Sequence, residues 1–245
     1  MESDHSARPD LPPPAEAGES PRHGFQGNRA PAPPPSGVPA GLTVAISRET
    51  GARGGTIGRR VGRKLGWQVV DQDLLEFLTQ DDQAFAELPP AAREWADHRL
   101  DQLLRARVLT NDASVIGLAR VVLLLGAQGE VVLVGRGAGY LLPPATTLHV
   151  RIVAPEADRI AYMAQWQRLT TEEAADEVRK RDNRRGEFLA THLGCTPNDP
   201  YPYDLIVNSS RLGEEPTAEL IAQAARGKLL GLEPDQDSSP AGAQG

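Results

Sequence analysis

A cluster of glycines directly after a short apolar run is the feature of this sequence best suited to chemistry. The apolar run, Thr43–Ile46, is typical of a buried β-strand. The glycines after it let the backbone bend and present its N–H groups to an anion; they are Gly51, Gly54, Gly55 and Gly58. A basic amphipathic helix is expected next, and its unpaired N-terminal amides would face the same anion. The stretch therefore predicts a phosphate-binding turn.

This turn departs from the P-loop signature, G-x-x-x-x-G-K-[ST], because no lysine stands where the helix begins. Three arginines of the predicted helix, Arg59, Arg60 and Arg63, either face the bound phosphate or form a solvated helix surface. The source of positive charge at the turn is thus the main question that this stretch raises.

Two charged residues follow other predicted strands. Asp71 comes directly after Trp67–Val70, and Arg136 follows Glu130–Val134 between two glycines. A guanidinium in that place suits phosphate binding through its paired N–H donors, and the alternative is an arginine in an exposed turn. These residues are therefore candidates for the same site as the glycine turn.

Strands that alternate with helical patterns predict an α/β domain with a mostly parallel five-stranded sheet and helices on both faces. The expected strands are Thr43–Ile46, Trp67–Val70, Glu130–Val134, Thr147–Val153 and Leu205–Val207. Helices are expected after the glycine turn, at Leu74–Leu78 with Asp73 as a cap, at Ala91–Leu109 and Ala113–Ala127, and from Pro155, Thr170 and Pro216 onward. Ligands bind such sheets at the carboxyl ends of the strands, where the glycine turn, Asp71 and Arg136 are expected to meet.

Composition divides the 245-residue chain into a domain, 41–232, between two tails. Residues 1–40 hold 10 of the 21 prolines and almost no large apolar side chains, so this tail and the polar residues 233–245 are predicted to be disordered. The formal net charge of −7 argues against bulk nucleic-acid binding. A single cysteine, Cys195, excludes an internal disulfide. With no signal pattern and no apolar run long enough for a membrane, we expect a soluble cytoplasmic protein, of undetermined oligomeric state.

The order of these features resembles the P-loop nucleoside monophosphate kinases, and most closely the cytidylate kinase-like family. The resemblance covers about Gly41 to Leu229. It rests on segments that follow one another in the family's order, namely SRETGARGG with TIGRRVGRKLG, VVDQDLL, VVLVGRGAGYLL, LHVRIVAPEADRI, KRDNRRGEF and YDLIVNSS. Their joint order and spacing make the resemblance more specific than any one segment.

The resemblance implies that the glycine turn holds the phosphates of ATP, through Gly51, Ala52, Arg53, Gly54, Gly55 and Thr56. In ordinary monophosphate kinases the lysine would fall at Gly54 and the magnesium-binding hydroxyl at Gly55. Arg53 or Arg59 is a candidate to replace the charge. Thr56, one residue late, is a candidate to replace the hydroxyl.

The resemblance also assigns Asp71 and Arg136 to the acceptor nucleotide, with residues 81–112 as an acceptor-binding helical part. Residues 170–195 correspond to a lid whose catalytic residues would be Arg181, Asp182 and Arg185. Arg184 falls on another face of that helix. The competing interpretation of the lid arginines is a salt-bridged surface helix, because Glu177 and Glu187 are near enough to pair with them.

The function implied by the resemblance is ATP-dependent phosphoryl transfer to a nucleoside monophosphate, CMP or dCMP, with Mg²⁺ between the phosphates. The alternative is a nucleotide-binding regulatory or interaction protein that lost transfer activity together with the lysine and the hydroxyl. A third possibility is a kinase for another small phosphorylated acceptor. His149, inside an apolar strand, is expected to be a core histidine. No nucleophilic role is assigned to His192 or Cys195.

Overall fold

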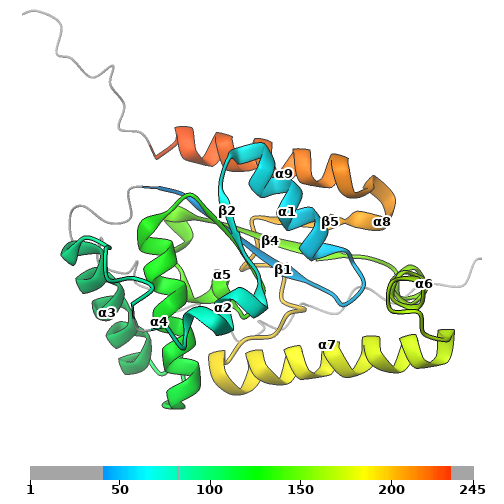
Figure 1. Cartoon of the computed structure of the whole chain (residues 1–245), viewed down its shortest axis with the longest axis horizontal. Helices are drawn as coiled ribbons and strands as arrows, with labels where there is room; N and C mark the ends of the chain where they lie inside the picture. The colour runs from blue at the N-terminus through cyan, green and yellow to red at the C-terminus, as the bar shows by residue number, and fades with distance from the viewer. Residues whose placement is uncertain (1–40, 82, 233–245) are drawn as a thin grey trace, which may run out of the picture. The chain divides into compact units, whose positions relative to one another are not determined.

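The computed structural model describes residues 41–81 and 83–232, so the predicted tails, 1–40 and 233–245, lie outside the described residues. Five strands form one sheet in the order β2-β3-β1-β4-β5, and every neighbouring pair is parallel (Figure 1). The strands are β1 (Thr43–Arg48), β2 (Gln68–Val70), β3 (Val131–Val134), β4 (Thr147–Val153) and β5 (Leu205–Asn208). The predicted α/β class and five-stranded parallel sheet are therefore confirmed.

Helices connect these strands. They are α1 (Gly54–Leu65), α2 (Gln72–Leu78), α3 (Pro90–Arg105), α4 (Ala113–Gln128), α5 (Ala138–Leu141), α6 (Glu156–Gln167), α7 (Thr171–Leu193), α8 (Ser209–Leu212) and α9 (Glu214–Leu230), with a 3₁₀ turn at Pro144–Thr146. The helix predicted from Thr170 onward is α7, and a capping box formed by Thr170 and Glu173 begins it. The last helix begins two residues before Pro216.

Two predicted helix boundaries are wrong. Asp71, rather than Asp73, caps α2, because its Oδ1 accepts the Leu74 N–H at 3.2 Å. The helix α3 ends at Arg105, before the predicted Leu109, and Arg107 has a left-handed backbone with φ of 56°. Both corrections concern backbone conformation at helix ends, which apolar periodicity does not report.

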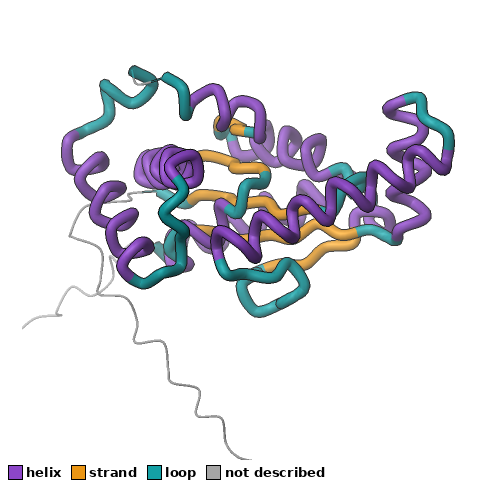
Figure 2. The backbone as a smooth tube through the Cα atoms, turned by 90° about the horizontal axis from the view of Figure 1, so that it is seen from below, coloured by secondary structure: helices purple, strands orange, loops and turns teal. Residues whose placement is uncertain are grey.

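The sheet has a hydrophobic core on each face. Alternate residues of a strand point to opposite faces, so Val44 and Ile46 pack with α1 and α9, whereas Ala45 packs with the core that includes α4. Figure 1 shows α1 and α9 on one side of the sheet and α4, α5 and α7 on the other. Viewed from below, the long helix α7 crosses in front of the strands (Figure 2). Helices thus cover both faces, as predicted.

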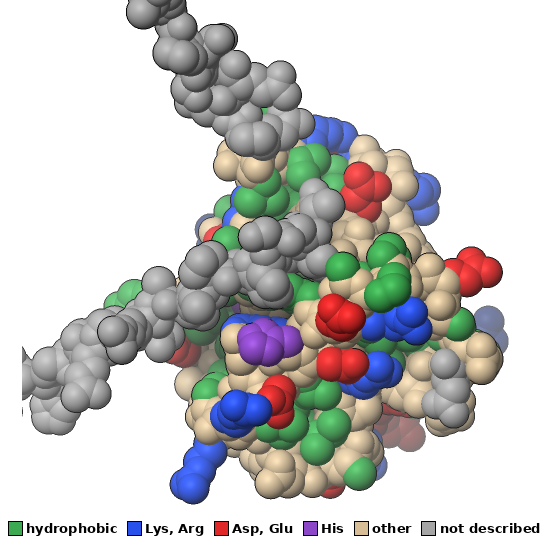
Figure 3. All heavy atoms as spheres, turned by 90° about the vertical axis from the view of Figure 1, so that its left-hand side faces the viewer, with side chains coloured by type: hydrophobic (Ala, Val, Ile, Leu, Met, Phe, Trp, Pro, Cys, Tyr) green, Lys and Arg blue, Asp and Glu red, His purple; other side chains and the backbone are tan. Residues whose placement is uncertain are grey.

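The helix α3 packs on α4, in the core on the same face of the sheet as α4. Its Trp95 is only 3% exposed. Acidic and basic side chains are interspersed on the face that includes α3 (Figure 3); one pair joins Arg120 of α4 to Asp97 of α3 at 2.8 Å. Among the described residues, no helix combines the length and the apolar character needed to cross a membrane.

The helix α1, which follows the glycine turn, lies very close to β2. A Cβ added to Gly62 would collide with the side chain of Val69 and lie 2.9 Å from the carbonyl oxygen of Trp67. The carbonyl belongs to the backbone and has little freedom to move. Gly62 is therefore required for α1 to lie this close to the sheet.

We expect Gly62→Ala to lower the free energy of unfolding by about 1–3 kcal/mol, the usual cost of overpacking a core. The matched control is Gly117→Ala, which lies in α4 with open space around the added Cβ. It should stay within about 1 kcal/mol of the wild type or exceed it, since alanine is the better helix former. Urea denaturation measures both, and equal stabilities would contradict the packing argument.

His149 is a buried histidine with both ring nitrogens engaged, as predicted. Its Nδ1 lies 2.9 Å from the carbonyl oxygen of Pro202 and must donate to it, so Nε2 accepts from the Ser47 hydroxyl at 3.2 Å. Burial lowers the pKa of His149 to about 4, against opposing effects of the Pro202 hydrogen bond and the Asp204 charge; the Lys228 charge also lowers it. The ring is therefore neutral near pH 7.

We expect this residue to make folding pH-dependent. Because the pKa is near 4 when folded and near the ordinary 6.5 when unfolded, protonation favours the unfolded state. The contribution of neutral His149 is complete above pH 6.5 and is lost as the pH falls toward 4. The free energy of unfolding should fall by about 2 kcal/mol between pH 8 and pH 5 through this residue, measured by urea denaturation.

The His149→Gln variant should show a smaller decrease over the same pH range. The exposed His98 on α3 provides the control, because His98→Gln should leave the wild-type pH dependence unchanged. An equal decrease in the wild type and in His149→Gln would show that other groups cause it.

Candidate functional site

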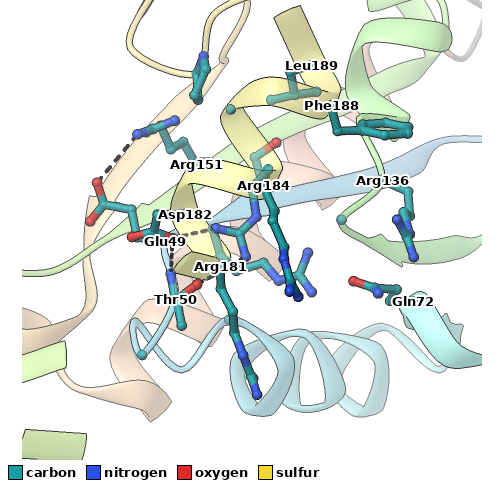
Figure 4. Close-up of a pocket in the computed structure, with 18 of the residues that line it drawn as sticks. Glu49, Thr50, Gln72, Arg136, Arg151, Arg181, Asp182, Arg184, Phe188 and Leu189 are labelled. Carbon is teal, nitrogen blue, oxygen red and sulfur yellow. Dashed lines mark hydrogen bonds and ion pairs between the residues drawn. The ribbon is translucent and has the colours of Figure 1, made fainter. Parts of the chain in front are cut away.

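A cavity of about 1120 Å³ opens at the carboxyl ends of the strands. It is walled by the glycine turn, the residues after β3, the helix α7 and part of α6 (Figure 4). Typical small-molecule sites measure roughly 300–1,000 Å³, so this cavity lies just above the upper end of the range for such sites. The sequence predicts a site at this edge of the sheet.

Positive charge dominates the cavity wall. Eight arginines line it, namely Arg48, Arg53, Arg59, Arg136, Arg151, Arg181, Arg184 and Arg185. Only four acidic residues do so, Glu49, Glu177, Asp182 and Glu187. The wall thus carries an excess of four positive charges in a chain whose formal net charge is −7. Such a concentration favours an anionic ligand.

The glycine turn leads into α1 without a side-chain cap. Gly51 has φ of 84° and Arg53, the residue before the helix, has φ of 61°, so the backbone reverses through left-handed conformations. The hydroxyl of Ser209 donates to the Ala52 carbonyl at 2.9 Å and holds the turn from behind. No acidic residue stands in the first turn of α1. The N-terminal amides of this helix are therefore suited to an anion.

Asp182 connects α7 to the start of the glycine turn through hydrogen bonds. One of its oxygens accepts the backbone N–H of Thr50 at 2.9 Å and Arg185 Nη1 at 2.7 Å. The other accepts Arg159 Nη1 at 2.7 Å, and Arg159 also donates to the Thr50 carbonyl at 3.1 Å. Burial alone would raise the pKa of Asp182, but the Thr50 hydrogen bonds and the two arginine charges outweigh it and lower the pKa. The carboxylate therefore stays ionised.

Arg136 sits in an unusual backbone segment at the end of β3. It has φ of 54° between Gly135 and Gly137, at 99° and 69°, which explains why glycines flank it. Its guanidinium pairs with Glu76 of α2 and lies 5.9 Å from the ring centroid of Phe188. Burial lowers its pKa, against the charge of Asp73. A left-handed non-glycine residue with an arginine side chain at a cavity is a functional candidate.

Three arginines of α7, Arg181, Arg184 and Arg185, line the cavity. Figure 4 shows Arg181 and Arg184 reaching toward α1, with Arg136 and Gln72 at another end of the site. Arg184 lines the same cavity as Arg181, so its predicted placement on a different face is wrong, because residues three apart lie on the same side of a helix. Arg181 is also 2.5 Å from Glu177, so the predicted surface pairing is present as well.

Several residues around the cavity are not among those predicted from the sequence. Arg48 is the last residue of β1 and Thr50 follows two residues later, and both line the cavity; Arg159 of α6 bonds to the lining residue Asp182. Glu49 accepts the Ala154 N–H at 3.1 Å and lies 3.4 Å from Arg151, so it joins β1 to β4. The signal for Arg48 and Glu49 was their place directly after an apolar strand. Arg159 had no signal in its helical pattern.

Other predicted site residues have different neighbours. Arg53 lies over the ring of Tyr162, 4.9 Å from its centroid, and 3.5 Å from Glu214. Asp71 caps α2, and its charge reaches Arg48. Among the described residues, none from the predicted acceptor segment 81–112 lines the large cavity. The acceptor role of that segment stays a prediction.

Oxygen donors at the cavity edge are compatible with Mg²⁺ bound through phosphates. Mg²⁺ binds through one or two protein oxygens and keeps several waters and substrate phosphate oxygens. Thr56 in the first turn of α1 lines the cavity and offers a hydroxyl, whereas Asp71, directly after β2, is not among the lining residues and its carboxylate caps α2. Among the described residues there is no cluster of three or more histidine, cysteine or acidic side chains for a dedicated metal site. These donors therefore fit a nucleotide-bound cation better than a permanent one.

The model of the cytidylate kinase-like family matches residues 43–211, which is more than half of the chain and includes the glycine turn, Arg136 and the lid arginines. The chain belongs to the cytidylate kinase-like family. This confirms the resemblance read from the sequence. No curated protein sequence matches the chain.

Solved structures similar to this family member have low sequence identity. An uncharacterized protein from Eubacterium ventriosum matches with a TM-score of 0.54 at 15% identity, over 76% of this chain and 98% of the other. Shikimate kinase from Bacteroides thetaiotaomicron matches with a TM-score of 0.43 at 16% identity, over 78% of this chain and 99% of the other. The first of these matches supports the fold.

We expect Asp182→Asn to lower the free energy of unfolding by about 1–3 kcal/mol, because hydrogen bonds to a charged group are lost. The matched control is Asp176→Asn on the same helix, whose pair with Arg179 is mostly exposed. The control should change stability by less than about 1 kcal/mol. Combining Asp182→Asn with Arg159→Met in a double-mutant cycle should give a non-zero coupling energy. If the two substitutions change the free energy of unfolding additively in urea denaturation, the proposed contact between Asp182 and Arg159 does not stabilise the protein.

Proposed function

We propose that this protein is an ATP-dependent phosphotransferase that moves the γ-phosphoryl group of ATP to a nucleoside monophosphate. Membership of the cytidylate kinase-like family supports the reaction class and suggests CMP or dCMP as the acceptor. The observation that carries the proposal is the cavity wall with eight arginines and four acids, next to an uncapped helix N-terminus. That combination suits a site for two phosphorylated ligands.

The roles follow from where each group lies. The turn Gly51–Thr56 and the first amides of α1 bind the donor phosphates. Arg136 binds the acceptor monophosphate from the end of β3. Arg181 and Arg185, brought over the turn by the Asp182 hydrogen bonds, offset the charge of the transferring group. Little covalent chemistry is needed, because phosphoryl transfer depends on positioning and charge stabilisation.

The step itself is a substitution at the γ-phosphorus. A bond forms between the γ-phosphorus and a phosphate oxygen of the acceptor, and the bond to the bridging oxygen of ADP breaks. Mg²⁺, when bound with the nucleotide, would neutralise part of the phosphate charge, and Thr56 at the cavity wall would offer it a hydroxyl. The products are ADP and a nucleoside diphosphate.

The competing candidate is a nucleotide-binding regulatory protein without transfer activity. The absence of a lysine at Gly54 favours it, since a phosphate-binding cation at that place stabilises the transition state by several kcal/mol in P-loop enzymes. The charged groups on α7 favour the enzyme, because a protein that only binds has little need for arginines on a lid. A kinase for another small phosphorylated acceptor differs from both only in its substrate.

We expect the full-length protein, incubated with ATP, Mg²⁺ and a panel of monophosphates, to form ADP and a diphosphate product with at least one acceptor. The panel includes CMP, dCMP, UMP, AMP and GMP, and mass spectrometry identifies the product. Arg136→Ala should raise the acceptor KM by about tenfold to hundredfold, because hydrogen bonds to a charged group are lost.

The matched control is Arg105→Ala on α3, an exposed arginine whose side chain is 80% accessible. It should keep wild-type kinetics. Saturable ATP binding without turnover on any acceptor would support the regulatory protein instead. Turnover that is insensitive to Arg136→Ala would place the acceptor elsewhere.

A further inference from the structure

The side chain of Arg48, the last residue of β1, packs against two glycines. A Cβ added to Gly54 would lie 2.7 Å from Cβ and 2.8 Å from Cγ of Arg48. A Cβ added to Gly135 would collide with Nη1 of Arg48 and lie 2.9 Å from its Cζ. The stem of Arg48 thus passes over the first residue of α1, and its guanidinium lies at the end of β3. A side chain at Gly54 would meet the fixed stem of Arg48, whereas at Gly135 it would displace the guanidinium and also adopt a left-handed backbone with φ of 99°.

The contact at Gly54 leaves no space for the side chain of a P-loop lysine. Gly54 stands where ordinary monophosphate kinases carry that lysine. The atoms of Arg48 that block this position are Cβ and Cγ, which lie next to the backbone and cannot swing away as a side-chain tip can. A lysine at Gly54 and an arginine at Arg48 therefore exclude each other in this backbone. The stem of Arg48 occupies the space that a side chain at position 54 would need.

The guanidinium of Arg48 lies among like charges. Burial and the charges of Arg185 and Arg136 lower its pKa to about 10, against the charge of Asp71, so it remains protonated at neutral pH. Among the described residues it makes no ion pair or hydrogen bond. A partly buried cation between two other cations destabilises an empty site and would be compensated by a bound polyanion.

The other candidate cations of the turn are less suited to this task. Arg53 is 3.5 Å from Glu214 and stacks over Tyr162, so its charge is partly engaged outside the turn. Arg59 is exposed, and its guanidinium lies 3.5 Å from the Thr56 hydroxyl. Arg48 alone of the three begins beside Gly54 of the donor turn and ends at Gly135, where the charges of Arg136 and Arg185 act on it.

We propose that Arg48 replaces the P-loop lysine, as the catalytic residue that binds the transferring phosphoryl group between donor and acceptor. This inference rests on the proposed phosphotransferase function. A guanidinium can contact oxygens of both ligands through its several N–H donors. Its direction of approach differs from that of a lysine on the helix, because Arg48 comes from the strand.

The experiment uses the full-length protein and four variants. Arg48→Met keeps the stem and removes the charge, and Arg48→Gly removes the side chain. Arg48→Gly with Gly54→Lys exchanges the two positions, and Arg105→Met is the matched surface control. The readouts are kcat with ATP and the best acceptor, the melting temperature, and the affinity for inorganic tripolyphosphate by calorimetry.

We expect Arg48→Met to lower kcat by about 10²-fold or more and to weaken tripolyphosphate binding by about tenfold or more. Its melting temperature should equal or exceed that of the wild type, because removing the charge relieves repulsion and desolvation. A merely structural arginine would lower the melting temperature instead. The exchanged variant should regain at least about tenfold in kcat over Arg48→Gly, since lysine then occupies its usual place.

The proposal is overturned if Arg48→Met keeps kcat within about threefold of the wild type and binds tripolyphosphate equally well, or if the exchanged variant is no faster than Arg48→Gly. Should Arg48→Met fail to fold, the comparison between Arg48→Gly and the exchanged variant decides. If instead the proposed phosphotransferase function is wrong, the wild type itself shows no phosphoryl transfer, so the two failures can be told apart. In that case unchanged tripolyphosphate affinity in Arg48→Met still rejects Arg48 as a phosphate ligand.

Discussion

The carboxylate of Asp182 joins three parts of the site that are far apart in the sequence. It accepts a backbone N–H from the glycine turn, a guanidinium from α6 and a second guanidinium from its own helix. These contacts bring α7 over the start of the turn and orient Arg185 toward the Thr50 hydroxyl, 3.3 Å away. The placement of the lid arginines depends on this one negative charge. Without it, the guanidiniums of Arg159 and Arg185 would lose the carboxylate that they share.

Positive charge in the cavity exceeds what the protein itself neutralises. Glu49 pairs with Arg151 and Asp182 pairs with Arg159, and these contacts connect strands and helices. Arg136 pairs with Glu76 of α2, whereas the guanidinium of Arg48 makes no ion pair or hydrogen bond among the described residues. Burial lowers the pKa of both Arg48 and Arg136. The cavity thus combines arginines that join elements of the protein with a cation that is available to a ligand.

Glycines control which cations reach the site. At Gly54 and Gly135 the missing side chains leave the space that Arg48 fills, and at Gly51 an added Cβ would lie 2.5 Å from the backbone oxygen of Arg159. The glycines of the turn therefore serve packing as well as backbone flexibility. The same principle acts in the core, where Gly139 leaves room for the ring of His149.

The sequence by itself determined the fold class, the family and the edge of the sheet where the site lies. Apolar runs such as Thr43–Ile46, and the glycines after them, are local features, and the carboxyl ends of parallel strands necessarily share one edge. For the same reason Arg136, flanked by glycines at a strand end, was identifiable from its neighbours along the chain.

Only the tertiary structure decided which charges meet. Arg48 and Gly54 are close in sequence, yet their exclusion of one another depends on how β1 leads into α1. Arg159 reaches Asp182 because α6 and α7 pack side by side, and Asp71 proved to be a helix cap because of its backbone conformation. Side-chain pairing depends on distances between elements, and periodicity along a chain does not contain them.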